Sequence, residues 1–238
     1  MRSYYLIFCA LFSVLAAPCL AQSAASVVFA SGAAVIVGKD GQSRPAVRGG
    51  EFGAGETMDT VDGRVQLRFP DGASMSLQPA TRFRIDDFRF LARDGKASGD
   101  DRGFFSLLKG GFRTITGLIG KEKREQYRVE TVVATIGIRG TDYSAQLGDS
   151  GLLLSTFGGL VEVCSGAGCV QVGPGQTAQV AERDSRPVVQ GGQGSGASDR
   201  GGVDTAPVVP GGPPPPVVAP EITAPQAPVR QMQTGPYY

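Results

Sequence analysis

Alternation of apolar and polar residues, interrupted by glycine, is the feature that most constrains the fold of this 238-residue chain. Across residues 64–77, apolar side chains occupy every second position on both sides of the turn Pro70-Asp71-Gly72. A period of two places successive side chains on opposite faces of a strand, and Gly72 can supply the positive φ that a three-residue hairpin loop requires. Twenty-six of the 35 glycines lie in residues 22–183, where long stretches with helical periodicity are few. Residues 22–183 are therefore predicted to form an all-β domain of many short antiparallel strands joined by Gly-rich turns.

The same alternation predicts the other strands of this domain. Phe83 and Ile85 continue the pattern, and further strands are expected at 27–37, 45–49, 127–133, 141–147, 151–157, 159–164, 169–173 and 176–181. Residues 104–109 fit either a strand or one helical turn. Residues 117–125 end in a dense run of charges, which fits a solvated loop or a short helix.

The composition changes abruptly at about Asp184. Eleven of the 16 prolines lie in residues 184–238, together with three Gly-Gly pairs and few large apolar side chains. Such a segment cannot bury enough surface to offset the entropy lost on ordering. Residues 184–238 are therefore predicted to be a disordered Pro/Gly-rich tail, which could span the cell-wall layer, present a ligand to a partner, or have no selected role.

The first 21 residues have the layout of a secretory signal peptide. Arg2 precedes an apolar run over residues 4–17, and small residues lead to a cleavage site between Ala21 and Gln22. The run is shorter than the roughly 20 residues that a membrane-spanning helix needs. Pro18 before Cys19 is a poor match to a lipoprotein signal. We therefore expect a soluble periplasmic or secreted protein with no stable membrane insertion after cleavage.

Secretion suggests how the cysteines are used. Only Cys164 and Cys169 would remain in the mature chain, separated by four residues that include two glycines. In an oxidising compartment this pair is expected to form a disulfide across a hairpin. A redox pair is less consistent because that motif has two intervening residues, and a thiolate metal site lacks further ligands.

Composition argues against catalysis and nucleic-acid binding. The chain has no histidine, which excludes Ser-His-Asp triads, and its 23 basic and 22 acidic residues balance once Arg2 is removed. Residues 106–109 match S-x-x-K but lack the S-D-N and K-T-G partner motifs. Adjacent carboxylates, as at Asp86-Asp87 and Asp100-Asp101, should point to opposite faces of a strand and so not converge on a substrate. No enzymatic activity, cofactor or metal is expected.

Several blocks resemble, in order, the FecR domain family, named for the periplasmic iron-dicitrate regulator. The most specific is residues 129–143, which are similar to the family's T-P-x-A-x-x-x-x-R-G-T-x-F pattern with Val132 in place of proline and Tyr143 as the aromatic residue. Other similar blocks, spread over about residues 55–181, are 55–60, the hairpin 63–77, 109–113, 158–163 and 173–176.

The resemblance implies an all-β, non-catalytic domain. Founding members of the family are anti-sigma regulators whose periplasmic part contacts the signalling domain of an outer-membrane transporter, linked by a transmembrane helix to a cytoplasmic domain. In this chain we expect a cleavable signal and no second apolar segment. We therefore carry over the domain and not the anti-sigma role.

The signature residues Ile138, Arg139, Gly140, Thr141 and Tyr143 are the candidate binding residues. Glycine at 137 and 140 permits a bend or bulge at which Arg139 turns inward or across a strand to bind a carboxylate or backbone carbonyls. A structural arginine network and a contact with a ligand carboxylate or glycan both fit.

The sequence therefore predicts a binding module of the bacterial envelope. It would bind an envelope protein or a cell-wall polymer through an exposed sheet edge or the concave sheet face, in envelope sensing or signalling. The alternative is a structural or adhesive envelope protein that works through its Pro-rich tail.

Overall fold

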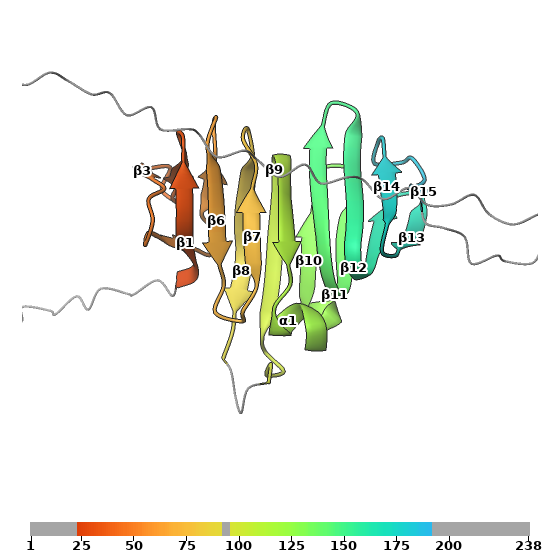
Figure 1. Ribbon diagram of the computed structural model, residues 1–238, viewed down its shortest axis with the longest axis horizontal. Helices are drawn as coiled ribbons and strands as arrows, with labels where there is room; N and C mark the ends of the chain where they lie inside the picture. The colour runs from red at the N-terminus through yellow and green to blue at the C-terminus, as the bar shows by residue number, and fades with distance from the viewer. Residues whose placement is uncertain (1–22, 92–95, 192–238) are drawn as a thin grey trace, which may run out of the picture. The chain divides into compact units, whose positions relative to one another are not determined.

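The computed structural model describes residues 23–91 and 96–191. The signal peptide expected over residues 1–21, its cleavage site at Ala21-Gln22, and residues 192–238 of the expected tail lie outside the described residues. Within the described ranges, fifteen strands form one mixed sheet, which confirms the predicted all-β class. Figure 1 shows these strands side by side, with a short helix at one end. No helix within these ranges is both long enough and apolar enough to cross a bilayer.

The sheet is bent into two layers because three long strands each contribute to both. These strands are β9 (Arg102–Ile115), β11 (Thr135–Gly148) and β12 (Gly151–Ser165). The C-terminal part of β9 pairs with the C-terminal part of β11, whereas β10 (Tyr127–Glu130) lies between their N-terminal parts. The β9–β10 pairing is parallel and makes the sheet mixed.

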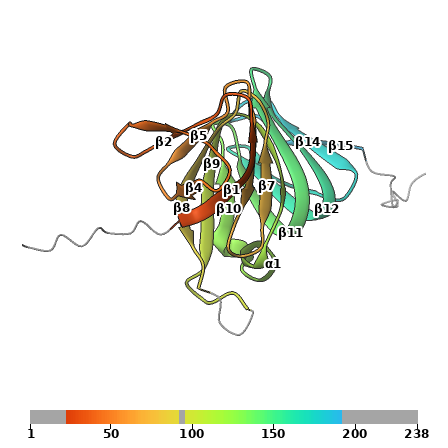
Figure 2. The same cartoon turned by 60° about the vertical axis from the view of Figure 1, so that its left-hand side comes forward.

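The remaining strands extend each layer from these three. The first layer continues through β7 (Ser74–Leu77), β6 (Arg64–Arg68), β1 (Ser23–Ser31) and β4 (Glu51–Gly53) on one side, and through β14 (Gln176–Val180) and β15 (Val188–Gly191) on the other. The second layer continues through β8 (Arg82–Arg89), β5 (Thr57–Asp59), β2 (Val35–Val37) and β3 (Ser43–Pro45) on one side, and β13 (Gly168–Val172) on the other. In Figure 2, β8 and β9 lie on one side of the bent sheet and β12 and β14 on the other.

Glycine allows β11 and β12 to bend together. Gly140 and Gly159 adopt φ of +62° and +78°, and the pairing register of the two strands shifts between Arg139 and Asp142. Before its bend β12 pairs with β14 in the first layer, and after it with β13 in the second. A Cβ on Gly159 would collide with the Gly140 carbonyl oxygen, so the two backbones approach too closely for a side chain.

The core lies between the layers and is rich in aromatic rings. Phe69, which follows β6, contacts Phe88 of β8 and Phe105 of β9, with ring centroids 5.3 and 5.6 Å apart. Phe83 of β8 packs against Phe112, in the first-layer part of β9, at 5.6 Å. The Phe69 contacts join strands that share no ladder hydrogen bonds, and Phe112 lies in β9 beyond its ladder with β8, so packing of apolar side chains holds the layers together.

The predicted strands are found with different boundaries. The segment expected at 27–37 is two strands, because the chain turns at Gly32 and the Ala33 N–H donates to the Asp62 carboxylate. The strand expected at 45–49 is absent beyond Pro45, the last residue of β3. The Gly50 N–H instead donates to the Val47 carbonyl in a turn between β3 and β4, and the Gly49 N–H donates to the Val27 carbonyl of β1.

The longer strands also differ in extent from the predicted ones. The strand expected at 127–133 ends at Glu130, where the Thr131 hydroxyl forms a turn with Ala134. The strand at 141–147 begins earlier, at Thr135, and those at 151–157 and 159–164 are one bent strand. Residues 104–109 are strand, and residues 118–122 form the short helix α1 (Leu118–Glu122), followed by the 3₁₀ turn Arg124–Gln126.

The sheet extends into the segment whose composition predicted a tail. β15 pairs with β14 in antiparallel register, Pro187 is buried, and Val189 packs against the core. The boundary expected at residue 183 therefore falls short of the last strand. A short apolar pair after a proline carries too little periodicity to be distinguished from the surrounding Gly/Pro-rich composition.

The bend predicts a specific sensitivity at Gly159. Gly159→Ala should lower the free energy of unfolding by roughly 2–4 kcal/mol, since it adds a left-handed backbone penalty to a backbone collision. The measurement is urea denaturation followed by far-UV circular dichroism. Gly148→Ala is the matched control in the partner strand, because a Cβ there meets nothing within 4 Å, and equal losses in both variants would contradict this account of the bend.

Candidate functional site

The signature residues lie at the bend of β11 and mostly face the core. Ile138, Thr141 and Tyr143 are buried, whereas Arg139 is exposed. Strict alternation would place Ile138 and Thr141, three residues apart, on opposite faces of the strand. The register shift at Gly140 turns Thr141 inward as well, so the predicted bulge is present.

Thr141 ties the end of β9 to this bend. Its backbone N–H donates to the Thr116 hydroxyl at 2.9 Å, and its carbonyl accepts from the Thr116 backbone N–H and hydroxyl at 3.0 and 3.2 Å. The buried Oγ1 atoms of Thr141 and Thr156 have no hydrogen-bond partner among the described residues. The signature threonine therefore acts through its backbone.

Tyr143 occupies the centre of the core. Its ring packs edge-on against Phe112 at 5.7 Å, and its hydroxyl lies 3.5 Å from that of Tyr127 on β10. Burial raises the pKa of both tyrosine hydroxyls, so both are neutral over the physiological range. The pair links the two layers without an ionisable group near neutral pH.

Arg139 does not turn inward, contrary to expectation. Because Ile138 points into the core, strand alternation directs Arg139 outward, and the bulge begins only at the next residue. No hydrogen bond or ion pair to it is found within residues 23–91 and 96–191. The arginine that does bind a carboxylate here is Arg113, whose guanidinium donates twice to Asp142 at 3.0 and 2.9 Å.

The hairpin signature has a structural role that reaches beyond its own turn. Asp71 is almost fully buried, and its carboxylate accepts hydrogen bonds from the N–H groups of Ala73 at 3.0 Å and Ile119 at 3.4 Å. Its carbonyl accepts from Leu118 at 3.0 Å. Gly72 has φ of +88°, as the predicted turn requires. Asp71 thus holds the first turn of α1 against the end of the hairpin.

Helix α1 closes this end of the core beside the signature bend. Ile119 is fully buried, and a Cβ on Gly120 would meet the Ile138 side chain. The hairpin turn, α1 and the signature bend are far apart in sequence but meet here. The motif residues are therefore mainly architectural, and the surface around them must supply any binding contacts.

The outer side of the first layer carries a row of hydroxyl and amide side chains, which we call the amide face. Ladder register aligns one residue from each of eight neighbouring strands, and burial places all of them outward. In order they are Phe29, Gln66, Ser76, Arg113, Ser144, Ser155, Thr177 and Gln190.

The outer side of the second layer is chemically different, and we call it the ion-pair face. Acid–base pairs join its side chains along β5, β8, β9 and β10. They are Arg82–Asp59, Arg84–Asp86, Arg102–Asp87 and Arg128–Glu130. These pairs neutralise four arginines of this face, and Arg89 and Arg139 lie outside them. On the amide face, Arg64 and Arg68 have no ion pair within the described ranges.

A groove with an exposed aromatic ring beside it lies on the amide face. The groove has a volume of about 360 Å³ and is lined by side chains of Phe29, Arg64, Gln66, Gln78 and Arg113, among others. Phe157 adjoins it, with the Arg113 guanidinium carbon 4.3 Å from its ring centroid. The concave face, which was a candidate for binding, is instead filled by the core.

The residues weighed for catalysis are engaged in structural contacts. The Ser106 hydroxyl donates to Asp86 at 2.6 Å, and no bond joins it to Lys109 in the part of the chain that the structure describes. The expectation that Asp86 and Asp87 face opposite ways is wrong, because a bulge between Ile85 and Asp87 turns both outward, each to a separate arginine.

Asp101 fastens the loop that precedes β9. Its buried carboxylate accepts from the N–H groups of Leu91 and Ser98 at 2.7 and 2.6 Å. Desolvation opposes its ionisation, but these hydrogen bonds prevail and lower its pKa. Within residues 23–91 and 96–191, no three His, Cys, Asp or Glu side chains gather in a way that could hold a metal ion.

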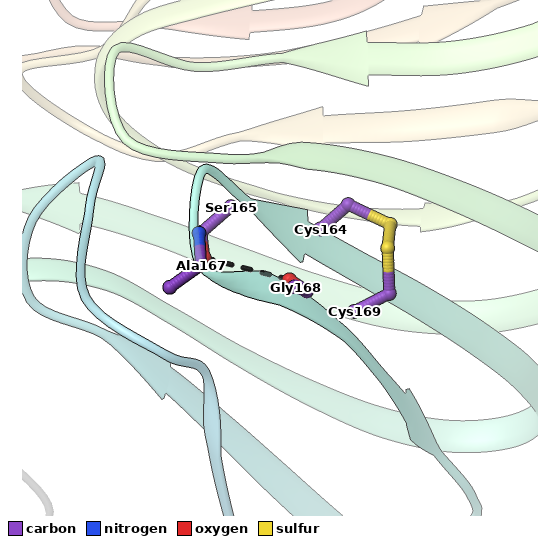
Figure 3. Close-up of a disulfide and its surroundings, with 5 residues drawn as sticks. All are labelled: Cys164, Ser165, Ala167, Gly168 and Cys169. Carbon is purple, nitrogen blue, oxygen red and sulfur yellow. Dashed lines mark hydrogen bonds between the residues drawn. A yellow bond between two sulfur atoms is a disulfide. The ribbon is translucent and has the colours of Figure 1, made fainter.

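The disulfide predicted between Cys164 and Cys169 is present. The two residues face each other in the antiparallel β12–β13 ladder, next to the turn that joins the strands (Figure 3). In the turn, the Ala167 N–H donates to the Ser165 hydroxyl at 3.2 Å. The bond therefore clamps the hairpin that ends the second layer.

Comparisons with known proteins place the family match over the bent part of the sheet. A family model described as FecR protein matches residues 56–162. Two crystal structures of a candidate anti-sigma factor from Parabacteroides distasonis, at 1.65 and 2.50 Å resolution, are similar with 17% identity and a TM-score of 0.40. Each alignment covers 54% of this chain and 55% of the other, so the chain spans about half the length of that protein. No curated protein matches the chain.

Removing the Asp71 carboxylate should destabilise the domain. Asp71→Ala would leave two buried N–H groups, of Ala73 and Ile119, without acceptors, at a cost of about 1–3 kcal/mol in the free energy of unfolding. Urea denaturation gives this value. A loss as small as that of an exposed alanine substitution would show that the carboxylate does not anchor α1.

Asp71 also predicts a pH dependence. Desolvation raises its pKa in the folded protein above the ordinary value of 3.8, although the hydrogen bonds oppose this. The folded state then binds the proton more tightly, so the stability gained from protonation is complete below the unfolded pKa and is lost as pH rises through the folded pKa. The stability of the wild type relative to Asp71→Asn should therefore fall with rising pH across that window, and an opposite slope would contradict the assignment.

The disulfide should contribute modestly, because it closes a short loop. Replacing both cysteines by serine should lower the free energy of unfolding by about 2 kcal/mol. Thermal or urea unfolding of the oxidised wild type and the double variant measures the difference. An unchanged near-UV spectrum is expected, and global loss of structure would show a larger role.

Proposed function

We infer, from the FecR domain that the chain carries over residues 56–162, that this protein is a non-catalytic binding module in envelope sensing or signalling. The FecR family is regulatory rather than catalytic. The groups weighed for catalysis, Ser106, Asp86 and Asp87, are occupied by hydrogen bonds and ion pairs, which supports a binding role.

We further propose that the protein works in the periplasm or outside the cell. The signal-like segment at residues 1–21 and the Cys164–Cys169 disulfide both support an oxidising compartment. FecR domains are periplasmic in the family. Its partner would then be an envelope protein or a cell-wall polymer.

The amide face is the surface that we assign to this binding. The carrying observation is the groove on this face, which Arg64 lines without an ion pair within the described ranges, whereas four arginines of the ion-pair face, Arg82, Arg84, Arg102 and Arg128, are paired with acids. Unpaired guanidinium groups beside a groove can bind a partner without first breaking an internal pair. Phe29 and Phe157, both about half exposed, add apolar contact area.

Two arginines in similar settings provide a direct test of the face. Arg113 pairs with Asp142 and lies over Phe157, and Arg128 pairs with Glu130 and lies 4.4 Å from the centroid of Phe104 on the ion-pair face. Arg113→Ala should weaken retention of the purified protein on washed envelope fractions by roughly tenfold, whereas Arg128→Ala should leave it unchanged.

The measurement is co-sedimentation over a range of protein concentrations, with circular dichroism as a check on folding. Equal effects of the two substitutions would contradict the choice of face. If removal of residues 192–238 abolished retention while Arg113→Ala did not, the alternative of a protein that works through its tail would be correct instead.

A further inference from the structure

We propose that the amide face binds an acidic polysaccharide, a chain of sugars that carry carboxylate groups, laid across the strands from β1 to β14. This inference rests on the proposed function, because it names the ligand class of the same surface. It draws on the spacing of polar groups, the exposed aromatic rings and the unpaired arginines.

The polar groups of the amide face match sugar hydroxyls in chemistry. Gln66, Ser76, Ser144, Ser155 and Thr177 each offer both a donor and an acceptor, as every sugar hydroxyl does. The Ser155 and Thr177 hydroxyls already bond to each other at 2.9 Å across neighbouring strands. A ligand rich in hydroxyl groups can therefore both donate hydrogen bonds to this row and accept hydrogen bonds from it.

The spacing of the row suits a repeating polymer. Neighbouring strands lie about 4.7–4.9 Å apart, so from Gln66 to Gln190 the row presents one polar side chain per strand over about 29 Å. This interval is close to the rise of one sugar unit in an extended polysaccharide. A second outward row, Gln146, Leu153, Gln179 and Val188, runs beside it in the same register.

Two exposed aromatic rings on the amide face offer surfaces on which sugar rings could pack. The Phe29 and Phe157 side chains are 51% and 50% exposed, although phenylalanine is usually buried. Phe29 and Arg113 both line the groove of about 360 Å³, and Phe157 lies against Arg113. The C–H faces of sugar rings can cover these rings while the hydroxyls at their edges reach the neighbouring side chains.

The charge of the face selects an acidic ligand. Arg64, Arg68 and Arg113 project from it, and only Arg113 is paired with an acid among the described residues. A guanidinium binds a carboxylate through two parallel hydrogen bonds, which gives both strength and orientation. A protein partner is favoured less, because the buried centre of a protein interface is usually apolar, whereas six of the eight side chains of this row carry hydroxyls or amides.

Binding of the full chain to polygalacturonate, measured by isothermal titration calorimetry, tests the ligand class. The wild type should bind polygalacturonate at least tenfold more tightly than it binds dextran, a neutral polymer. Arg64→Glu should weaken binding to polygalacturonate by at least tenfold. Arg139→Glu is the matched control, because Arg139 is also exposed and unpaired within the described ranges but lies beyond the bend, and this variant should bind as the wild type does.

The possible failures can be told apart. If polygalacturonate does not bind, but Arg113→Ala still reduces retention on envelope fractions, the face is correct and the ligand class is wrong. If neither substitution matters, the proposed face itself fails. Equal loss in Arg64→Glu and Arg139→Glu would reflect general charge attraction and overturn the inference. Sedimentation velocity that shows a dimer dispersed by Arg64→Glu, without polysaccharide binding, would assign the face to a second copy.

Discussion

The close approach of the β11 and β12 backbones at Gly140 and Gly159 is the constraint on which the rest of the structure depends. Because both strands bend where no side chain intervenes, a single hydrogen-bonded sheet becomes two layers. The bend encloses the aromatic core around Phe83 and Phe112 and leaves two outer faces. A residue with a Cβ at 159 would separate the strands and open the core, which is why the bend can be tested by one substitution.

The signature residues support this bend instead of forming a pocket. Asp71 holds α1, Thr116 bonds to the backbone of Thr141, and Ile138 packs beside Gly120, so the hairpin and the bend stabilise each other. Of the two interpretations of the signature arginine, an internal network does not occur among the described residues, since Arg139 faces outward.

The two layers allow one domain to carry two unlike surfaces. The ion-pair face carries four arginine–acid pairs, and such exposed pairs contribute little to stability. The amide face retains unpaired arginines, half-exposed rings and a groove. This division supports the proposal that the first layer meets the ligand while the second layer, clamped at its end by the Cys164–Cys169 disulfide, serves as the scaffold.

Local pattern alone determined the β class and the hairpin at Asp71-Gly72, because alternation and turn chemistry act over a few residues. The Cys164–Cys169 bond was predictable from cysteine spacing together with the signal-like N-terminal segment. The tertiary structure decided what depends on distant partners. It merged the segments 151–157 and 159–164 into one bent strand, added β15, and turned Arg139 outward. The amide face had no signal in sequence, since its residues come from eight strands and become neighbours only through ladder register.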